Sequence, residues 1–114
     1  MAFVALGNTI SVSAGPTVSV ANIQTGTNTF RIINANATAY SYAGVFNDYT
    51  TALTLHHPAS GDPAGGYGVA IAPTQNETIT GNWGVNPNPQ TVYVAVITSA
   101  SSGQVVQITP VRSS

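Results

Sequence analysis

The sequence predicts an all-β fold, namely a single β-sandwich of jelly-roll or Ig-like (immunoglobulin-like) type with about eight antiparallel strands. Short runs rich in Val, Ile and Thr recur about every ten residues, and Gly, Pro and Asn separate them. No stretch carries an apolar stripe at helical spacing over several turns. Together, these observations favour strands joined by turns over any helical architecture.

Residues 91–98 form the stretch around which this prediction is organised. Its apolar side chains occupy both faces of an extended chain, Val92, Val94 and Val96 on one and Tyr93, Ala95 and Ile97 on the other. Such a strand belongs in the middle of a sheet that is covered on both sides. We expect it to form a hairpin with residues 104–109, and we expect Pro110 to end the last strand.

Alternation of apolar and polar residues predicts the remaining strands. Residues 29–43 are expected to form a second hairpin, whose turn carries Asn34 and Asn36, a residue type that tolerates a left-handed backbone. Residues 24–28 are predicted to be a loop, and the breaker-rich segment 45–66 is the least regular part of the chain. The predicted strands are residues 9–14, 18–21, 29–34, 37–43, 67–72, 77–80, 91–98 and 104–109.

The length of 114 residues predicts one domain, residues 1–114. Residues 1–8 form a possible N-terminal arm that either completes the domain's own sheet or docks onto a neighbouring subunit by strand addition. The beginning of the chain lacks the basic region of a signal peptide, and the longest apolar runs have the length of strands. We therefore expect neither secretion nor a membrane-spanning helix.

Charge is scarce, since the chain has two arginines, no lysine and three acidic residues. Only 4% of the residues are charged, against about one quarter in a typical globular domain. With little charge to keep copies apart, the composition favours burial of much of the surface in a permanent assembly, and an unusually inert surface is the alternative. A net charge of −1 makes nucleic-acid binding unexpected, and the absence of cysteine excludes disulfides and thiolate metal sites.

No catalytic or cofactor-binding set is expected. His56 and His57 are adjacent, so on an extended chain they point to opposite sides and do not grip one ion together. A metal shared between subunits on a symmetry axis is the alternative. The sequence contains no phosphate-binding or dinucleotide-binding glycine motif and no nucleophile elbow, and its few carboxylates argue against glycoside hydrolysis.

Interface residues are expected instead. Trp83 stands in a polar loop, where an aromatic side chain either tucks over the end of the sandwich or contacts a partner. The N-terminal arm poses the same question. The residues predicted to lie at an interface are Phe3, Val4, Leu6, His56, His57, Tyr67 and Trp83.

The order of these features resembles a known group of proteins. The segments that carry the resemblance are Leu6-Gly-Asn-Thr-Ile-Ser-Val12, Phe30-Arg-Ile-Ile-Asn-Ala-Asn-Ala37, Tyr42-Ala-Gly44, Val69-Ala-Ile-Ala-Pro73 with Glu77-Thr-Ile79, and Tyr93–Ile97 with Val105–Pro110. The pattern resembles the small β-sandwich structural proteins of tailed bacteriophage particles, which act as capsid decoration, cement or head-spike proteins. The chain departs from that pattern in residues 47–66 and 83–89, where the choice of partner could differ.

The resemblance implies a non-enzymatic virion protein, made in the host cytoplasm, that binds the major capsid protein on the outer capsid surface and stabilises the shell. A homo-oligomer is expected, with a trimer favoured. Two alternatives remain. One is a host-binding or carbohydrate-binding module of a tail or fibre, with Trp83, Tyr67 and His56–His57 as a platform for sugar stacking. The other is a tail-tube or adaptor subunit.

Overall fold

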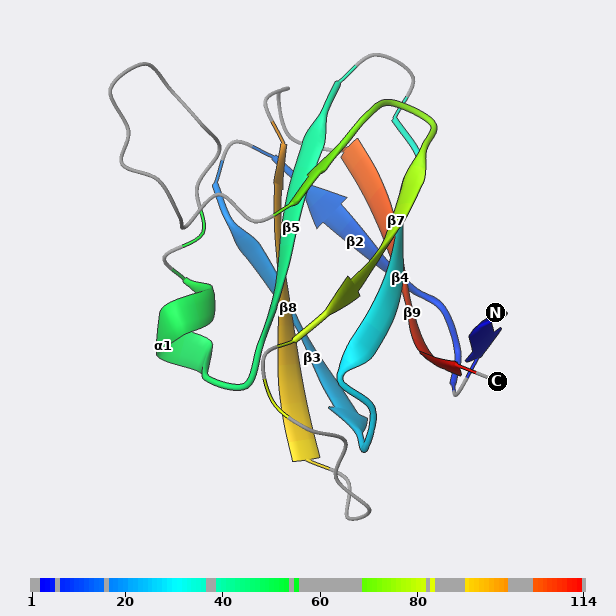
Figure 1. The fold of residues 1–114 in the computed structure, drawn as a ribbon. Coiled ribbons are helices and arrows are strands. Elements are labelled where there is room, and N and C mark those ends of the chain that lie inside the picture. The colour runs from blue at the N-terminus through cyan, green and yellow to red at the C-terminus, as the bar shows by residue number, and fades with distance from the viewer. Residues whose placement is uncertain are drawn as a thin grey trace.

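The computed structural model of the chain describes residues 3–5, 7–15, 17–36, 39–53, 55, 69–81, 83, 90–98 and 104–113, with the backbone alone at positions 3, 4, 104 and 113. These residues form strands and one helical turn (Figure 1). The elements are β1 (Phe3–Ala5), β2 (Ile10–Ala14), β3 (Ser19–Thr25), β4 (Thr29–Asn34), β5 (Ser41–Phe46), α1 (Tyr49–Ala52), β6 (Val69–Ile71), β7 (Asn76–Thr80), β8 (Gln90–Thr98) and β9 (Gln104–Ser113).

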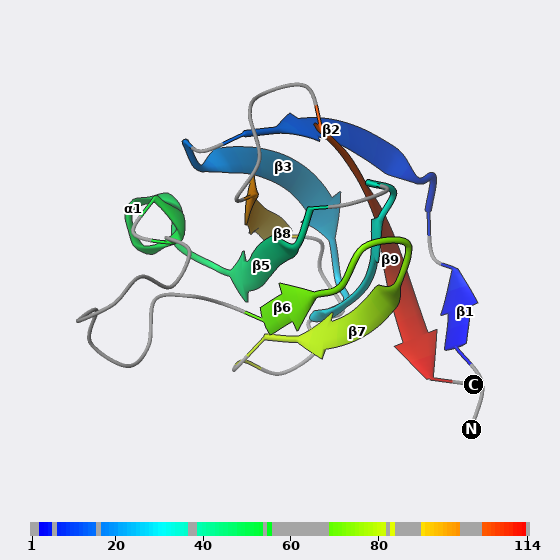
Figure 2. The same cartoon turned by 90° about the horizontal axis from the view of Figure 1, so that it is seen from above.

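The strands make two antiparallel sheets that face each other (Figure 2). Sheet A has the order β1-β9-β4-β7, with β2 pairing the same strand β9, and sheet B has the order β3-β8-β5-β6. The pairs β2–β9, β3–β8, β4–β7 and β5–β6 are nested, as in one long hairpin wrapped into two layers. This connectivity is that of a jelly roll. The predicted all-β sandwich is confirmed, and the strand order selects the jelly roll over the Ig-like alternative.

Both predicted hairpins are wrong. β8 lies in sheet B and β9 in sheet A, and β4 and β5 are likewise in different sheets. In fact most consecutive strands cross from one sheet to the other, so that sequence neighbours face each other across the core instead of pairing. The period-2 pattern identifies the buried face of a strand but carries no information about which strand lies beside it.

The main core lies between the sheets, where the largest fully buried apolar side chains are Phe30, Ile32, Ile71, Val92, Val94, Val96, Val106 and Ile108. The opposite face of β8 has a smaller core of its own. There Ala95 and Ile97 pack against Ala52 of α1 and Leu55, and all four are buried. The prediction that residues 91–98 form a central strand covered on both faces is therefore confirmed.

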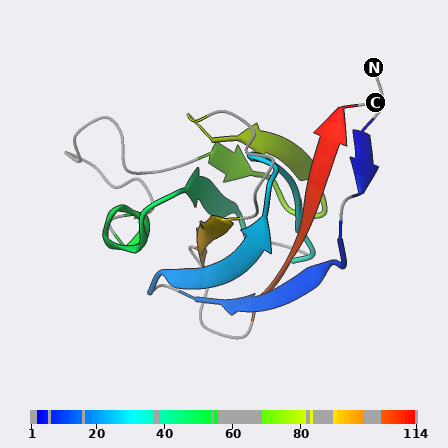
Figure 3. The same cartoon turned by 90° about the horizontal axis from the view of Figure 1, so that it is seen from below.

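Strand β9 does not end at Pro110. It continues to Ser113, with Pro110 opposite Phe30 of β4 and the last residues of the strand paired with β1. Figure 3 shows β1 alongside this C-terminal part of β9.

Pro110 is accommodated because, on the side where its N–H is missing, no strand pairs with β9 at this residue. The Ala35 N–H donates to the Val105 carbonyl at 3.2 Å, so the odd-numbered residues of β9 direct their backbone groups toward β4. Pro110 therefore faces the other edge, between the residues of β9 that pair with β2 and those that pair with β1. An ideal Cβ on Gly7 would lie 3.2 Å from the Pro110 ring, which shows that the β1–β2 connection passes directly over it.

A network of buried amides closes the end of the sandwich where β4 finishes. Asn34 is fully buried, and its Nδ2 donates to the carbonyls of Ala39 and Ile71, both at 2.9 Å, and of Ala72 at 3.2 Å. The Ala39 carbonyl lies just before β5, the Ile71 carbonyl ends β6, and the Ala72 carbonyl lies in the turn that follows. One side chain therefore fixes two chain crossings between the sheets.

Asn36 extends this network. Its Nδ2 donates to Asn34 Oδ1 at 2.6 Å and to Ser41 Oγ at 3.2 Å, and its Oδ1 accepts from the Val105 N–H at 3.0 Å. Neither asparagine uses the left-handed backbone that its residue type tolerates, since Thr74 is the one non-glycine residue with positive φ (63°) in the described part of the chain. The two amides are there for their hydrogen bonds.

Two strand boundaries and one element also differ from the sequence prediction. β3 runs through Thr25 into the expected loop, because its pairing with β8 extends to Gln90. β5 begins at Ser41 and continues to Phe46, later than the predicted strand 37–43. The segment after β5 contains the helical turn α1, which the sequence pattern did not predict. A turn of only four residues is too short to produce a helical pattern of apolar residues.

Candidate binding surface

The helical turn α1 is built on an aspartate. Asp48 has extended backbone angles (φ −140°, ψ 126°), and its Oδ2 accepts hydrogen bonds from the Thr51 N–H at 3.0 Å and from Thr51 Oγ1 at 2.8 Å. This is the geometry of an N-cap, which satisfies a backbone donor that the first helical turn leaves unpaired. The cap holds α1 against the outer face of sheet B, where Ala52 is buried.

With Ala52 turned inward, α1 turns two large side chains outward. Tyr49 is 48% exposed and Leu53 is 45% exposed, and at a spacing of four residues they lie on the same side of the turn. The Tyr49 ring meets the ring of Tyr93 edge to face, with centroids 5.6 Å apart and an interplanar angle of 61°. Half-buried Tyr42 and Phe46 of β5 pack on the same small core. We call Tyr42, Phe46, Tyr49, Leu53 and Tyr93 the aromatic surface.

Gly44 allows the aromatic surface to form. An ideal Cβ at this position would lie 2.7 Å from Cε2 and 2.8 Å from Cζ of Phe46, so a side chain at residue 44 would displace the phenyl ring. The arrangement gives four aromatic rings and one leucine on one outer face. Aromatic residues of this kind, presented on rigid elements, supply most of the binding energy in protein interfaces.

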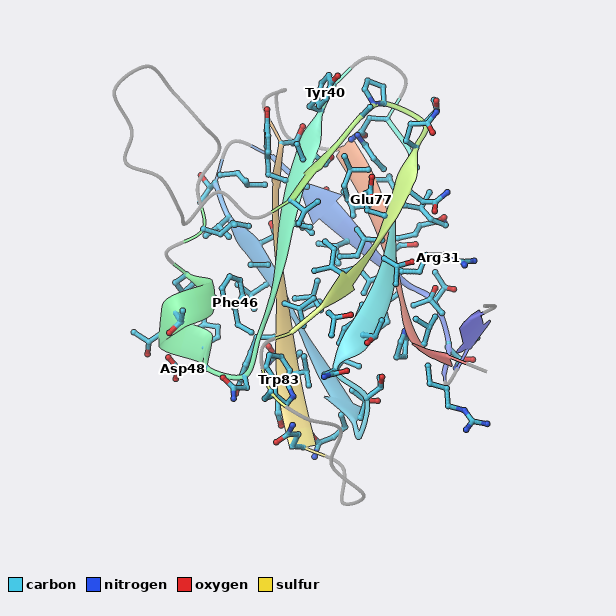
Figure 4. The ribbon with its side chains drawn as sticks, viewed as in Figure 1. Arg31, Tyr40, Phe46, Asp48, Glu77 and Trp83 are labelled. Atoms are coloured by element: carbon cyan, nitrogen blue, oxygen red, sulfur yellow. The ribbon has the colours of Figure 1, made fainter. Side chains whose placement is uncertain are left out.

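Trp83 is the one predicted interface residue whose side chain the structure describes. It is half-buried, packs against the main core, and lies at the end of the sandwich opposite Tyr40 (Figure 4). Its carbonyl accepts a hydrogen bond from Asn28 Nδ2, and Gly81 provides the space for its ring. The ring therefore packs over the end of the sandwich, and contact of its exposed part with a partner stays a prediction.

The other predicted interface residues are less fully placed. Phe3 and Val4 belong to β1, where their backbones pair with Ser113 and Arg112 of the same chain. Leu6, His56, His57 and Tyr67 lie outside the described residues.

Two residues that matter most on this surface, Tyr49 and Leu53, were not singled out from the sequence. The signal that could have found them is Asp48 followed three residues later by Thr51, an N-cap pattern in a segment without strand periodicity. The described part of the chain contains no group of three or more His, Cys, Asp or Glu residues placed to hold a metal ion. It also contains no helix long and apolar enough to cross a membrane.

Comparison of the chain with protein-family models, with curated proteins and with solved structures finds no match.

Proposed function

We propose that this protein is a non-enzymatic virion structural protein that decorates a phage capsid and binds the major capsid protein through the aromatic surface. The observation that carries the proposal is a cluster of aromatic side chains on one outer face, with Tyr49 and Leu53 exposed, on a fold that is almost free of charge. Copies also associate with one another, and the assembled protein lies on the outer face of the shell.

Two properties of the molecule support a structural role. The jelly roll is a recurrent fold of viral capsid domains, although lectins and cupins share it and fold alone does not assign function. A decoration protein acts by repeating one modest interface many times over a symmetric shell. Apolar contacts on a rigid sandwich suit that task, because little conformational entropy is lost at each copy.

Because the surface carries little charge, the proposal predicts that capsid binding depends only weakly on salt concentration. Contacts between exposed charges weaken as salt rises, whereas burial of apolar area does not. Among the described residues close to the aromatic surface, Asp48 is the charged one, and its carboxylate is engaged by Thr51. Attachment to the capsid should therefore change less than about threefold in affinity between low and moderate salt.

The test is co-sedimentation of the purified protein with empty heads prepared without it. Wild-type protein should bind to saturation at a fixed ratio to the major capsid protein. The double variant Tyr49→Ser, Leu53→Ser should bind at least about tenfold more weakly, since each side chain contributes an exposed anchor. The matched control is Val105→Ser, which removes a side chain of similar exposure (42%) from the outer face of sheet A and should bind like wild type.

A glycan array on the same preparations completes the test. A protein that ignores heads and binds a glycan is a carbohydrate-binding module, and one that ignores heads and binds tails is a tail or adaptor subunit. Either result overturns the decoration role. Equal binding by the double variant and by wild type would remove the aromatic surface from the proposal.

A further inference from the structure

Strand β3 is an open edge of sheet B. It pairs with β8 along its whole length, from Ser19 to Thr25, and no described strand pairs with its other side. The Thr98 N–H donates to the Gly15 carbonyl at 3.0 Å, which shows that even-numbered residues of β8 direct their backbone groups toward β3. Through the register of the pair, the odd-numbered residues of β3 face β8 and the even-numbered ones face outward.

Three residues therefore present backbone donors and acceptors at this edge: Val20, Asn22 and Gln24. Each offers one N–H and one C=O, and within the described part of the chain none of these six groups has a partner. Asn22 and Gln24 are exposed and Val20 is half-buried. The strand contains no charge and no proline, the two features with which natural proteins most often block such an edge.

The other edge strands are shorter than β3. β1 and β6 have only three residues each. β7 carries Glu77 opposite the fully buried Ile32, which places a charge on the inward-facing side of an edge strand. On β2 the carbonyl of Ser13 is occupied, since Ser19 Oγ donates to it at 3.2 Å. Among the described edge strands, β3 therefore offers the longest open edge.

We propose that a second copy of this chain pairs with β3, antiparallel and about a two-fold axis at Asn22, so that the two B sheets become one continuous sheet. The inference goes beyond capsid binding, because it concerns the free protein. Six backbone hydrogen bonds form, from Asn22 to its equivalent and between Val20 and Gln24 in both directions.

The occupant is identified by self-complementarity. About a two-fold axis at residue 22, each side chain of β3 meets one from the same face of the sheet: Asn22 meets itself and Val20 meets Gln24, while on the inner side Ala21 meets Ile23. Two asparagine side chains can hydrogen-bond to each other because each has a donor and an acceptor. No like charges are brought together, since β3 has none. This is an isologous contact, the kind that closes a dimer.

The test places charges at the two-fold axis and measures association by analytical ultracentrifugation. Wild-type protein should sediment as a dimer at micromolar to millimolar concentration. Asn22→Lys and Asn22→Glu should each weaken dimerisation at least about tenfold, because identical charges then face each other. An equimolar mixture of the two variants should associate again as a heterodimer, since opposite charges meet.

The control is Thr78→Lys, which adds the same charge to the edge of β7 and should leave the dimer intact. Thermal unfolding of each variant checks that it folds, since Asn22 is exposed and Thr78 is half-buried. A wild-type protein that is monomeric or forms a closed trimer would overturn the proposal, as would variants that dimerise normally or a mixture that does not associate. Because no capsid is present, the result is independent of the head-binding experiment.

Discussion

At one end of β4 the sandwich is closed by a network of buried amides, and at the other end by the indole ring of Trp83 together with buried Thr27, whose Oγ1 donates to the Val111 carbonyl at 2.6 Å. The polar end holds Asn34 and Asn36, whose hydrogen bonds reach β5, β6, β9 and the turns between them. At the other end Trp83 covers the core, held by Asn28, and its Nε1–H is buried with no hydrogen-bond partner in the described part of the chain. The ends solve the same problem, which is to exclude water from an open sandwich, by different physical means.

The difference between the two ends indicates which substitutions each end tolerates. A buried hydrogen-bond network has strict geometry, and a partner left unpaired costs its full desolvation energy. An apolar cover needs only shape and area, and tolerates replacement by a ring of similar size. The polar end should therefore be intolerant of changes that preserve shape, and the Trp83 end of changes that alter volume.

The largest effect is expected for Asn34→Asp, which keeps the shape and removes the donor. A carboxylate there would face the carbonyls that Nδ2 now serves. We expect a loss of roughly 3 to 5 kcal/mol in the free energy of unfolding at neutral pH, measured by urea denaturation. Burial raises the pKa of such a carboxyl group, so its penalty is greatest at neutral pH and shrinks as the pH falls and the group is protonated.

The control for this variant is Asn22→Asp. Asn22 is exposed on β3, so the same chemical change should alter the free energy of unfolding by less than about 0.5 kcal/mol when the protein is measured as a monomer. Similar losses in both variants would mean that the network at the end of β4 contributes nothing specific.

A smaller effect is expected at the other end for Gly81→Ala. An ideal Cβ at residue 81 would lie 2.2 to 2.7 Å from three carbons of the Trp83 ring, so the ring must move off the core. We expect a loss of about 1 to 3 kcal/mol and a red shift in fluorescence. The chain has one tryptophan, so its emission reports on this site alone. Gly7→Ala, where the corresponding contact with Pro110 is 3.2 Å, should leave the emission unchanged.

The smallest effect is expected for Trp83→Phe, which keeps an aromatic ring over the core and removes the unpartnered Nε1–H. The packing lost with the larger ring is offset by removal of a buried donor, and the net change in the free energy of unfolding should stay below about 1 kcal/mol. Thermal and urea unfolding would measure it. A loss as large as that of Asn34→Asp would contradict the contrast between the two ends.

Alternation in the sequence was enough to predict a β-sandwich and the faces of its strands. Val92, Val94 and Val96 were assigned to one buried face of β8 and Ala95 and Ile97 to another, and both assignments hold. This succeeds because the pleat fixes side-chain direction with a period of two, whatever the rest of the chain does. The scarcity of charge is likewise a property of the sequence alone, as is the absence of cysteine.

Only the tertiary structure decided which strands pair. The pattern of residues 104–109 is equally compatible with a hairpin partner and with a strand in the opposite sheet, because both bury one face. The roles of Asn34 and Pro110 followed from that pairing. Asn34 is a core residue because carbonyls from other segments converge on its amide, and Pro110 is tolerated because no strand pairs with β9 at that residue on the side opposite β4. Such contacts join residues far apart in the chain, and no local pattern in the sequence encodes them.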